Sequence, residues 1–295
     1  MTHVRVWGSR GSIASPGERT ARYGGNTSCV EVRIARGPVL VLDAGTGMRE
    51  LGELLRDEGV REIHVLLSHL HLDHLQGLAF FAPLYDPEVT IHLYGPPSPL
   101  HSLAERISAY MSDPLFPVHL AHVPAKLEMH DAPYEPITIG SASVVASPLA
   151  HRGPTVGWRI DDEAGSLAYL PDHEPAMVTR LENADPRWVS GAGLAHGVDV
   201  LLHDAQYSED EYPTHRGWGH SSIAHVVQFA RLAEVRRLVL FHHDPGHSDT
   251  DLDVLHSRAC ELWGPGADAP VIAFDGMAFT VAGLTPTPVE APASV

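Results

Sequence analysis

The feature that most constrains this chain is a run of six residues, His69-Leu70-His71-Leu72-Asp73-His74, that contains three histidines and an aspartate. The run follows an apolar, β-rich stretch at 62–68 that reads as a buried strand, and it precedes a stretch at 75–81 that reads as the start of a helix. In an extended segment His69 and His71 point the same way, because side chains alternate with period two. Imidazoles and a carboxylate gathered on one turn favour a site for zinc or a similar divalent ion over a solvated polar loop.

The pattern His-x-His-x-Asp-His after a strand resembles the metallo-β-lactamase superfamily. The resemblance implies an α/β fold of the αββα type, in which two mixed sheets are flanked by helices and two metals bind at one edge. It also implies that His69 and His71 bind one metal, that Asp73 and His74 bind the other, and that Asp73 orients the attacking hydroxide. The expected cofactors are two divalent metal ions, Zn²⁺ in the first place, with Mn²⁺ and Fe²⁺ as alternatives.

Other ligand-type residues follow later predicted strands, and the resemblance places them at the same centre. His151 stands where the superfamily has its third ligand histidine, and Asp172 looks like the carboxylate that bridges the two metals. Asp43 ends the predicted strand 39–43, where the superfamily often carries an aspartate that orients a ligand histidine. A turn or helix-capping role is the alternative for Asp43.

The last ligand is ambiguous on chemistry alone, because His242 and His243 are adjacent. Three segments look like ribonuclease Z, which carries a His-Glu-Ala-Thr segment, a His-Ser-Thr segment and a strand that ends in its last ligand histidine. The matching segments here are 200–207, 219–222 and 238–242. The resemblance favours His242, and it implies that Asp204 and His220 form a dyad that protonates a leaving oxygen. Asp204 stands where that family has glutamate, and the alternative for His220 is a cap on the following helix.

Three residues beside these ligands are candidates for substrate contact. Arg152 directly follows His151, and Arg216 and Trp218 shortly precede His220. An arginine can pair with a phosphate through two hydrogen bonds, and Trp218 could stack on a base or pack a lid. Ordinary structural roles are the alternative for all three.

The charge of the chain bears on the kind of substrate. The formal net charge is −17, and no basic run stands out beyond Arg236-Arg237. Such a surface repels polyanions at long range, and proteins that bind nucleic acid usually show a basic stripe. Long RNA or DNA is therefore not expected as the main partner, whereas a small phosphate ester is compatible with the charge.

The chain of 295 residues is expected to form a single domain over 1–284, because no linker divides it. The Pro- and His-rich segment 112–136 lacks clear periodicity and is interpreted as a lid or insertion, and the Pro/Ala/Thr-rich tail 285–295 is expected to be disordered. Helices are expected from Thr46, as a cap, to about Glu58 and over 98–111.

No stretch approaches the ~20 apolar residues that a membrane helix needs, so no membrane partner is expected. The start of the chain lacks a secretion signal, and the two cysteines have no CxxC partner, which together indicate a cytoplasmic protein. Whether it forms a homodimer is left open.

These observations predict a dinuclear metal-dependent hydrolase, specifically a phosphodiesterase that acts on a small phosphodiester such as a cyclic nucleotide. Three alternatives remain open: a ribonuclease Z-like RNA endonuclease, a hydrolase of carboxylic esters, lactones or thioesters on the same fold, and a metal-containing signalling module without turnover.

Overall fold

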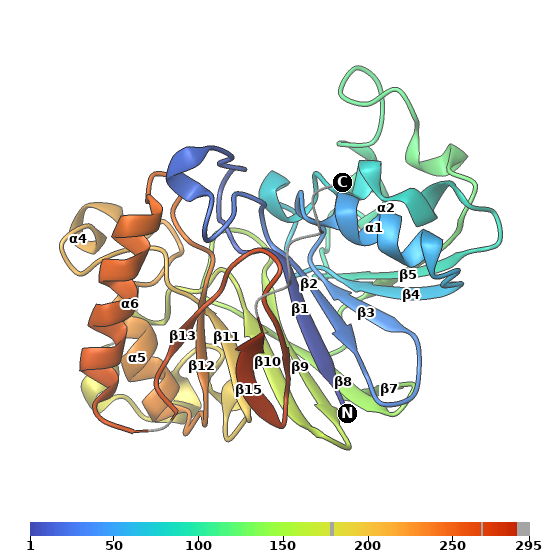
Figure 1. The fold of residues 1–295 in the computed structure, drawn as a ribbon. Coiled ribbons are helices and arrows are strands. Elements are labelled where there is room, and N and C mark those ends of the chain that lie inside the picture. Colours follow the sequence, from blue (N-terminus) through green and yellow to red (C-terminus); the bar gives the residue numbers. More distant parts are fainter. Residues whose placement is uncertain (178–179, 267, 288–295) are drawn as a thin grey trace.

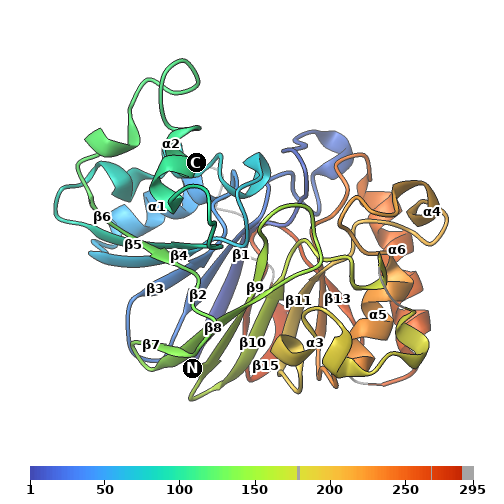
Figure 2. The same ribbon diagram turned by 180° about the vertical axis from the view of Figure 1, so that it is seen from behind.

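Two β-sheets face each other in the computed structural model, which describes residues 1–177, 180–266 and 268–287. The eight-stranded sheet has the order β15-β14-β1-β2-β3-β4-β5-β6, and the seven-stranded sheet has the order β13-β12-β11-β10-β9-β8-β7. Figures 1 and 2 show helices on the outer side of both sheets. The predicted fold class, two mixed sheets flanked by helices, is confirmed.

The bounds of the elements follow the chain. The strands of the first sheet are β1 His3–Gly8, β2 Cys29–Arg33, β3 Val39–Leu42, β4 Glu62–Leu66, β5 Thr90–Gly95, β6 Lys126–Asp131, β14 Ala278–Thr280 and β15 Gly283–Thr287. Those of the second are β7 Ile137–Ile139, β8 Ala142–Pro148, β9 Val156–Asp162, β10 Gly165–Leu170, β11 Val200–Asp204, β12 Leu238–Phe241 and β13 Val271–Ile272. The helices are α1 Met48–Asp57, α2 Leu103–Ser108, α3 Ala192–Ala195, α4 Tyr212–His215, α5 Ile223–Leu232 and α6 Asp249–Trp263.

Alternating apolar side chains on the central strands build the layers. Leu40 and Leu42 of β3 point into the core between the two sheets, whereas Val41 points outward into a second core beneath α1 and α2. A third core joins the outer face of the second sheet to α5 and α6, with Leu240 of β12 among its members. Because each sheet is covered on both faces, its central strands are apolar almost throughout.

Parallel pairing within each sheet brings several strand ends to the same edge. Strands β3 and β4 run parallel in the first sheet, and β10, β11 and β12 run parallel in the second. Their carboxyl ends lead into loops at the upper edge of the molecule in Figure 1. Residues that follow different strands are therefore close together, although they are far apart in the sequence.

Two local predictions about helices were wrong. The segment 75–81 contains the 3-10 turn Leu78–Phe80 instead of a helix start, because Gly77 packs so closely against the 44–45 backbone that a Cβ there would lie 1.9 Å from the Gly45 carbonyl oxygen. Thr46 does not cap α1, whose N-cap is Gly47. The Thr46 hydroxyl instead donates to Asn26 and accepts from the Thr27 amide.

The segment 112–136 is partly a regular element. Its residues 126–131 form β6, which pairs in parallel with β5 at the edge of the first sheet. A lid or insertion role for 112–136 stays a prediction. At the other end, residues 285–287 belong to β15, which pairs with β14, so the expected start of the disordered tail was too early, and 288–295 lie outside the described residues. In the described ranges, the helices are too short or too polar to cross a bilayer.

Candidate metal centre

The six-residue motif forms a tight turn at the carboxyl end of β4. The chain leaves the strand through Ser68, and Leu72–His74 then form a 3-10 turn whose N-cap is His71. His69, Asp73 and His74 are buried, whereas His71 is exposed and lines an open pocket. The local sequence therefore presents four ligand-type side chains from a single turn.

Ligand-type atoms converge there in two groups that share one carboxylate. The first group is His69, His71, His151 and Asp172, and the second is Asp73, His74 and His242. Asp172 Oδ2 lies 3.6 Å from His69 Nε2 and 3.5 Å from His151 Nε2. Its other oxygen, Oδ1, lies 3.0 Å from His74 Nε2 and 3.2 Å from His242 Nε2. One carboxylate thus presents one oxygen to each group, as a bridging ligand would.

The donor atoms fit a pair of cations. His69 Nε2 is buried and lacks a hydrogen-bond partner among the described residues. The Nε2 atoms of His74 and His242 lie only 3.2 Å apart. A single proton can join only one pair of these atoms. Without a cation, the lone pairs of the remaining donor atoms would therefore face one another. Imidazole nitrogens with carboxylate oxygens are the donor set that zinc and related divalent ions prefer.

The pKa values of the histidines in the two groups also fit metal binding. Burial lowers the pKa of His69 well below its ordinary value, and it also lowers the pKa values of His71 and His151. These imidazoles are neutral, which is the form that binds metals. Burial opposes a charge on His74, but Asp172 and the neighbouring aspartates raise its pKa well above the ordinary value. A positive charge is therefore favoured at this position.

Each buried ligand histidine is oriented through its other ring nitrogen. His74 Nδ1 donates to Asp43 Oδ2 at 2.7 Å, and His151 Nδ1 donates to the Gly219 carbonyl at 2.9 Å. His242 Nδ1 lies 3.1 Å from Gln206 Oε1. Such partners fix the ring and raise its basicity as a ligand. Asp43 lies where the sequence placed it, whereas the role of Gln206 was missed, although it stands at the end of the His-Asp-Ala-Gln segment.

The choice between the adjacent histidines is clear in the structure. His242 Nε2 lies 3.2 Å from Asp73 Oδ2, whereas His243 turns away and its Nε2 donates to the Ala273 carbonyl at 2.9 Å. Gly11, which the sequence did not single out, packs against the ligand ring so closely that a Cβ would lie 2.3 Å from His242 Cε1. A side chain at position 11 would displace this ligand.

Asp204 and His220 form a buried pair beside the carboxylate of Asp172. His220 Nδ1 donates to Asp204 Oδ2 at 2.7 Å and lies 3.9 Å from Asp172 Oδ2. Burial disfavours the charged ring, but Asp204 and the metal-site carboxylates raise the pKa of His220 to about 9. The N-cap of α5 is Ser222, whose hydroxyl accepts from the His225 amide, so His220 does not serve as that cap. The carboxylate of Asp204 therefore favours the protonated form of the His220 ring.

An open pocket lies over these groups. Its lining consists of Ser12, Leu70, His71, Leu72, Asp73, Asp172, His220 and His242. The Ser12 amide donates to Asp73 Oδ2 at 2.7 Å, so the loop after β1 also orients a ligand. A substrate in this pocket would meet His220 and both metal groups at once.

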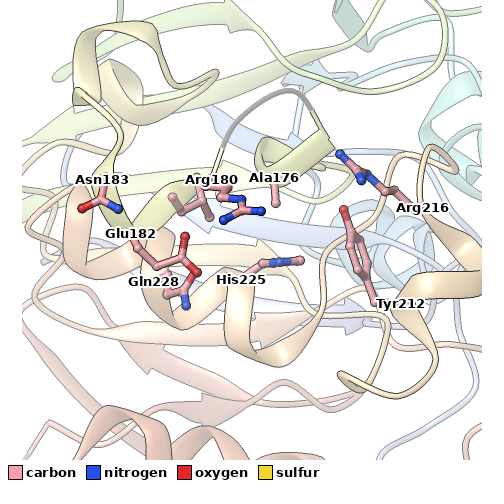
Figure 3. Close-up of a pocket in the computed structure, with 9 residues that line it drawn as sticks. Ala176, Arg180, Glu182, Asn183, Tyr212, Arg216, His225 and Gln228 are labelled. Carbon is pink, nitrogen blue, oxygen red and sulfur yellow. The ribbon is translucent and has the colours of Figure 1, made fainter.

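None of the three predicted substrate residues is among the described residues that line this pocket. Arg152 donates from Nε to the Gly217 carbonyl at 2.8 Å, and the side chain of Trp218 is 55% exposed. Arg216 instead lines a separate pocket with Tyr212 and other residues, as Figure 3 shows. Their roles in substrate binding stay predictions.

Glu174 is a buried carboxylate that the sequence did not single out. It accepts hydrogen bonds from the Gly217 amide at 2.8 Å, the Gly219 amide at 2.8 Å and the Tyr212 hydroxyl at 2.8 Å. It therefore fixes the loop whose Gly219 carbonyl holds His151. Its place two residues after Asp172 was the only signal in the sequence.

Comparison with known proteins identifies relatives along most of the chain. The family model described as the beta-lactamase superfamily domain matches residues 39–243. An uncharacterized protein of Mycobacterium tuberculosis is 32% identical over 273 residues, which cover 89% of this chain and 87% of that protein. A ribonuclease Z of Myxococcus xanthus is 27% identical over 290 residues, which cover 84% of this chain and 89% of that protein.

Solved structures show the same fold. The metallo-beta-lactamase fold protein YhfI from Bacillus subtilis matches with a TM-score of 0.66 and 18% identity, covering 95% of this chain and 99% of its own. A diphosphatase from the PhnP family matches with a TM-score of 0.64 and 20% identity, covering 95% and 97%. At these sequence identities the similarity shows a shared fold.

Proposed function

This chain belongs to the metallo-β-lactamase superfamily, and from that premise we propose that it is a dinuclear metal-dependent phosphodiesterase that acts on a small phosphodiester such as a cyclic nucleotide. The observation that carries the proposal is the Asp204–His220 pair, 3.9 Å from the bridging carboxylate of Asp172. A phosphodiester has a poor leaving oxygen, and a protonated imidazole beside the metal ligands is placed to supply its proton.

His69, His71 and His151 would hold one divalent ion, Asp73, His74 and His242 the other, and Asp172 would contact both. When bound, the two ions supply positive charge for the phosphate oxygens and lower the pKa of water toward about 7. The described side chains do the rest of the chemistry.

In this proposal His220 is the general acid. It holds its proton on Nε2, because Nδ1 donates to Asp204, and it gives that proton to the departing alkoxide. Asp204 stays ionised and stabilises the charged ring; its carboxylate also accepts the amides of Gln206 and Ser221, both at 3.1 Å. Asp73, held by the Ser12 amide, orients the attacking oxygen.

A small substrate is favoured over a long nucleic acid. The net charge of −17 repels a polyanion at long range, and among the described residues that line the pocket over the metal ligands there is no lysine or arginine. We therefore expect most of the binding energy to come from the phosphate at the metals.

A ribonuclease Z-like endonuclease is the second candidate. It is supported by the similarity to the ribonuclease Z of Myxococcus xanthus and by the shared order of the acid and histidine segments. Hydrolysis of a carboxylic ester, lactone or thioester has no comparable support, because those leaving groups depend less on an acid of this kind.

The test is turnover by the zinc- or manganese-loaded protein on bis-p-nitrophenyl phosphate, cyclic nucleotides, a tRNA precursor and a lactone. The proposal expects hydrolysis of the synthetic diester and of at least one cyclic nucleotide, both lost on chelation. Efficient maturation of the tRNA precursor at physiological salt would instead select the second candidate. A protein that binds metal but turns over none of these substrates would be a binding or signalling module.

A further inference from the structure

A second set of imidazoles and carboxylates lies on the first sheet, and none of its members belongs to the two groups described above. Parallel pairing places His64 of β4 opposite His92 of β5, and His92 opposite Glu128 of β6. His130 follows two residues later on β6. Because opposite residues, and residues two apart, share one face of a sheet, the register alone gathers these four side chains.

Three ligand-type atoms in this set converge on one point. His92 Nδ1 lies 3.2 Å from Glu128 Oε2 and 3.3 Å from His130 Nε2, and all three donor atoms lie within 4.8 Å of one another. Tetrahedral zinc with bonds of about 2.0–2.1 Å holds its ligand atoms roughly 3.3 Å apart. A proton on His92 Nδ1 can be donated to only one of its two neighbours, Glu128 Oε2 or His130 Nε2. A lone pair of the other neighbour would then face His92 Nδ1 with no hydrogen bond between them.

Neighbouring side chains hold the His92 ring in place. His64 stacks on it with the ring centroids 4.3 Å apart, and His64 Nε2 pairs with Glu62 Oε1 at 3.1 Å. On the next row of the sheet, Tyr94 stacks on His130 with the centroids 4.5 Å apart. Both imidazoles of the set are therefore supported by a stacked ring, which reduces the entropy lost when a cation binds.

We propose that His92, Glu128 and His130 form a further binding site for a divalent transition metal ion such as Zn²⁺, separate from the catalytic centre. Two imidazoles and one carboxylate are a donor set suited to such ions. The side chains of His92 and Glu128 are 19% and 33% exposed, so an ion can enter and can keep water as further ligands.

The site joins an edge strand to the body of the sheet. β6 is the outermost strand of the first sheet in the described chain and pairs only with β5 (Figure 2). A metal held by His92 on one strand and by two residues on the other would link them through side chains as well as backbone. Metal binding would therefore protect the backbone amides of β6 from exchange and slow the opening of this sheet edge.

The experiment measures zinc per full-length chain and amide exchange in β6 after equilibration with zinc and removal of the excess. The wild-type protein should hold one more zinc ion per chain than either His130→Gln or Glu128→Gln. Zinc should also slow amide exchange in β6 of the wild-type protein and not in the variants. The result is the difference in zinc content between the wild-type protein and each variant. This difference does not depend on whether the catalytic centre is fully loaded or active.

Lys126→Gln is the matched control, because it lies on the same edge strand and its ammonium pairs with Oε1 of Glu128, the oxygen that does not face His92. It should keep the additional zinc ion. His3→Gln, on β1 of the same sheet, should keep it too. Equal zinc content in wild type, His130→Gln and Glu128→Gln would overturn the proposal, and so would loss of the ion in Lys126→Gln, since disturbance of the strand would then explain the result.

Discussion

The two halves of the candidate metal centre are assembled in different ways. The first sheet supplies His69, His71, Asp73 and His74 from one turn of six residues. The second sheet supplies one residue at a time, each from the loop after a different strand: His151 after β8, Asp172 after β10 and His242 after β12. The first half is thus fixed by local sequence, whereas the second half depends on the register of a sheet.

The hydrogen-bond partners that hold the ligand histidines also differ between the two halves. In the first half Asp43 accepts from His74, from the Ser68 amide at 2.6 Å and from the Tyr169 hydroxyl at 2.9 Å. In the second half His242 has the neutral amide of Gln206 behind it, and the carbonyl that holds His151 belongs to a loop. The comparison predicts that the first half is the more rigid and the second half the easier to weaken selectively.

Replacement of the residue that joins the halves should have the largest effect. Asp172→Asn leaves one oxygen in place of two and removes the charge that faces the imidazoles of the four candidate ligands His69, His74, His151 and His242, so we expect turnover to be lost and zinc to fall below the wild-type content. Metal analysis and hydrolysis of bis-p-nitrophenyl phosphate measure both effects. Asp57→Asn, at an exposed position at the end of α1, is the control. Full zinc content with normal turnover would show that Asp172 is not shared.

His220→Ala should lower the rate next most strongly while leaving the metals bound. General acid catalysis is typically worth about 10²–10⁴-fold, and the loss should be small for p-nitrophenolate, which needs little protonation. Turnover of paired substrates with good and poor leaving groups, together with zinc content, tests this. If the variant loses metal, or slows both substrates equally, His220 belongs to the second half of the centre as a ligand or a binding residue.

The pH profile should carry the signature of the same histidine. A general acid must be protonated, so the rate on a substrate with a poor leaving group should fall as the pH rises through the pKa of His220, which the carboxylates raise to about 9. Bound cations would move this alkaline limb of the pH–rate profile to lower pH. Asp204→Asn removes the main raising influence, so its limb should lie at lower pH than that of the wild type under the same metal loading. An unchanged alkaline limb in Asp204→Asn would contradict the assignment.

A matched pair of variants compares the support of the two halves directly. Asp43→Asn and Gln206→Met each remove the partner of one ligand histidine, and such partners are typically worth about 10–100-fold in metal affinity or activity. Asp43→Asn should weaken zinc binding more, because Asp43 is a buried charge with several donors. Competition with a chelator of known affinity ranks the variants. A larger loss in Gln206→Met would reverse the comparison.

Glu174→Gln should have the smallest effect. The amide keeps one acceptor oxygen for the Gly217–Gly219 loop but loses the other, so His151 should be less firmly held and zinc affinity should fall by less than in either variant of the matched pair. The same chelator competition applies, with Glu182→Gln as a nearby control. Wild-type affinity in Glu174→Gln would show that the loop holds its shape without this carboxylate.

Much of this architecture could be predicted because its signals are local. The strands β3, β4 and β12 are short, mainly apolar runs rich in β-branched and aliphatic residues, and the histidine motif lies on one turn. The expected helix at 75–81 failed for a reason that is not local, namely the close packing of Gly77 on the 44–45 backbone. Gln206 and Glu174 escaped notice because an isolated polar residue has no pattern, and their roles depend on what the fold brings opposite them.

The sequence by itself determined the fold class, the family and the first half of the metal centre, because the six-residue motif after an apolar run is a signal contained in a few residues. Only the tertiary structure decided that the two oxygens of Asp172 face different groups, that His242 turns inward while His243 bonds to Ala273, and that His64, His92, Glu128 and His130 share one face. These facts follow from strand register and from the direction of single side chains, which are set by packing between segments far apart in the chain.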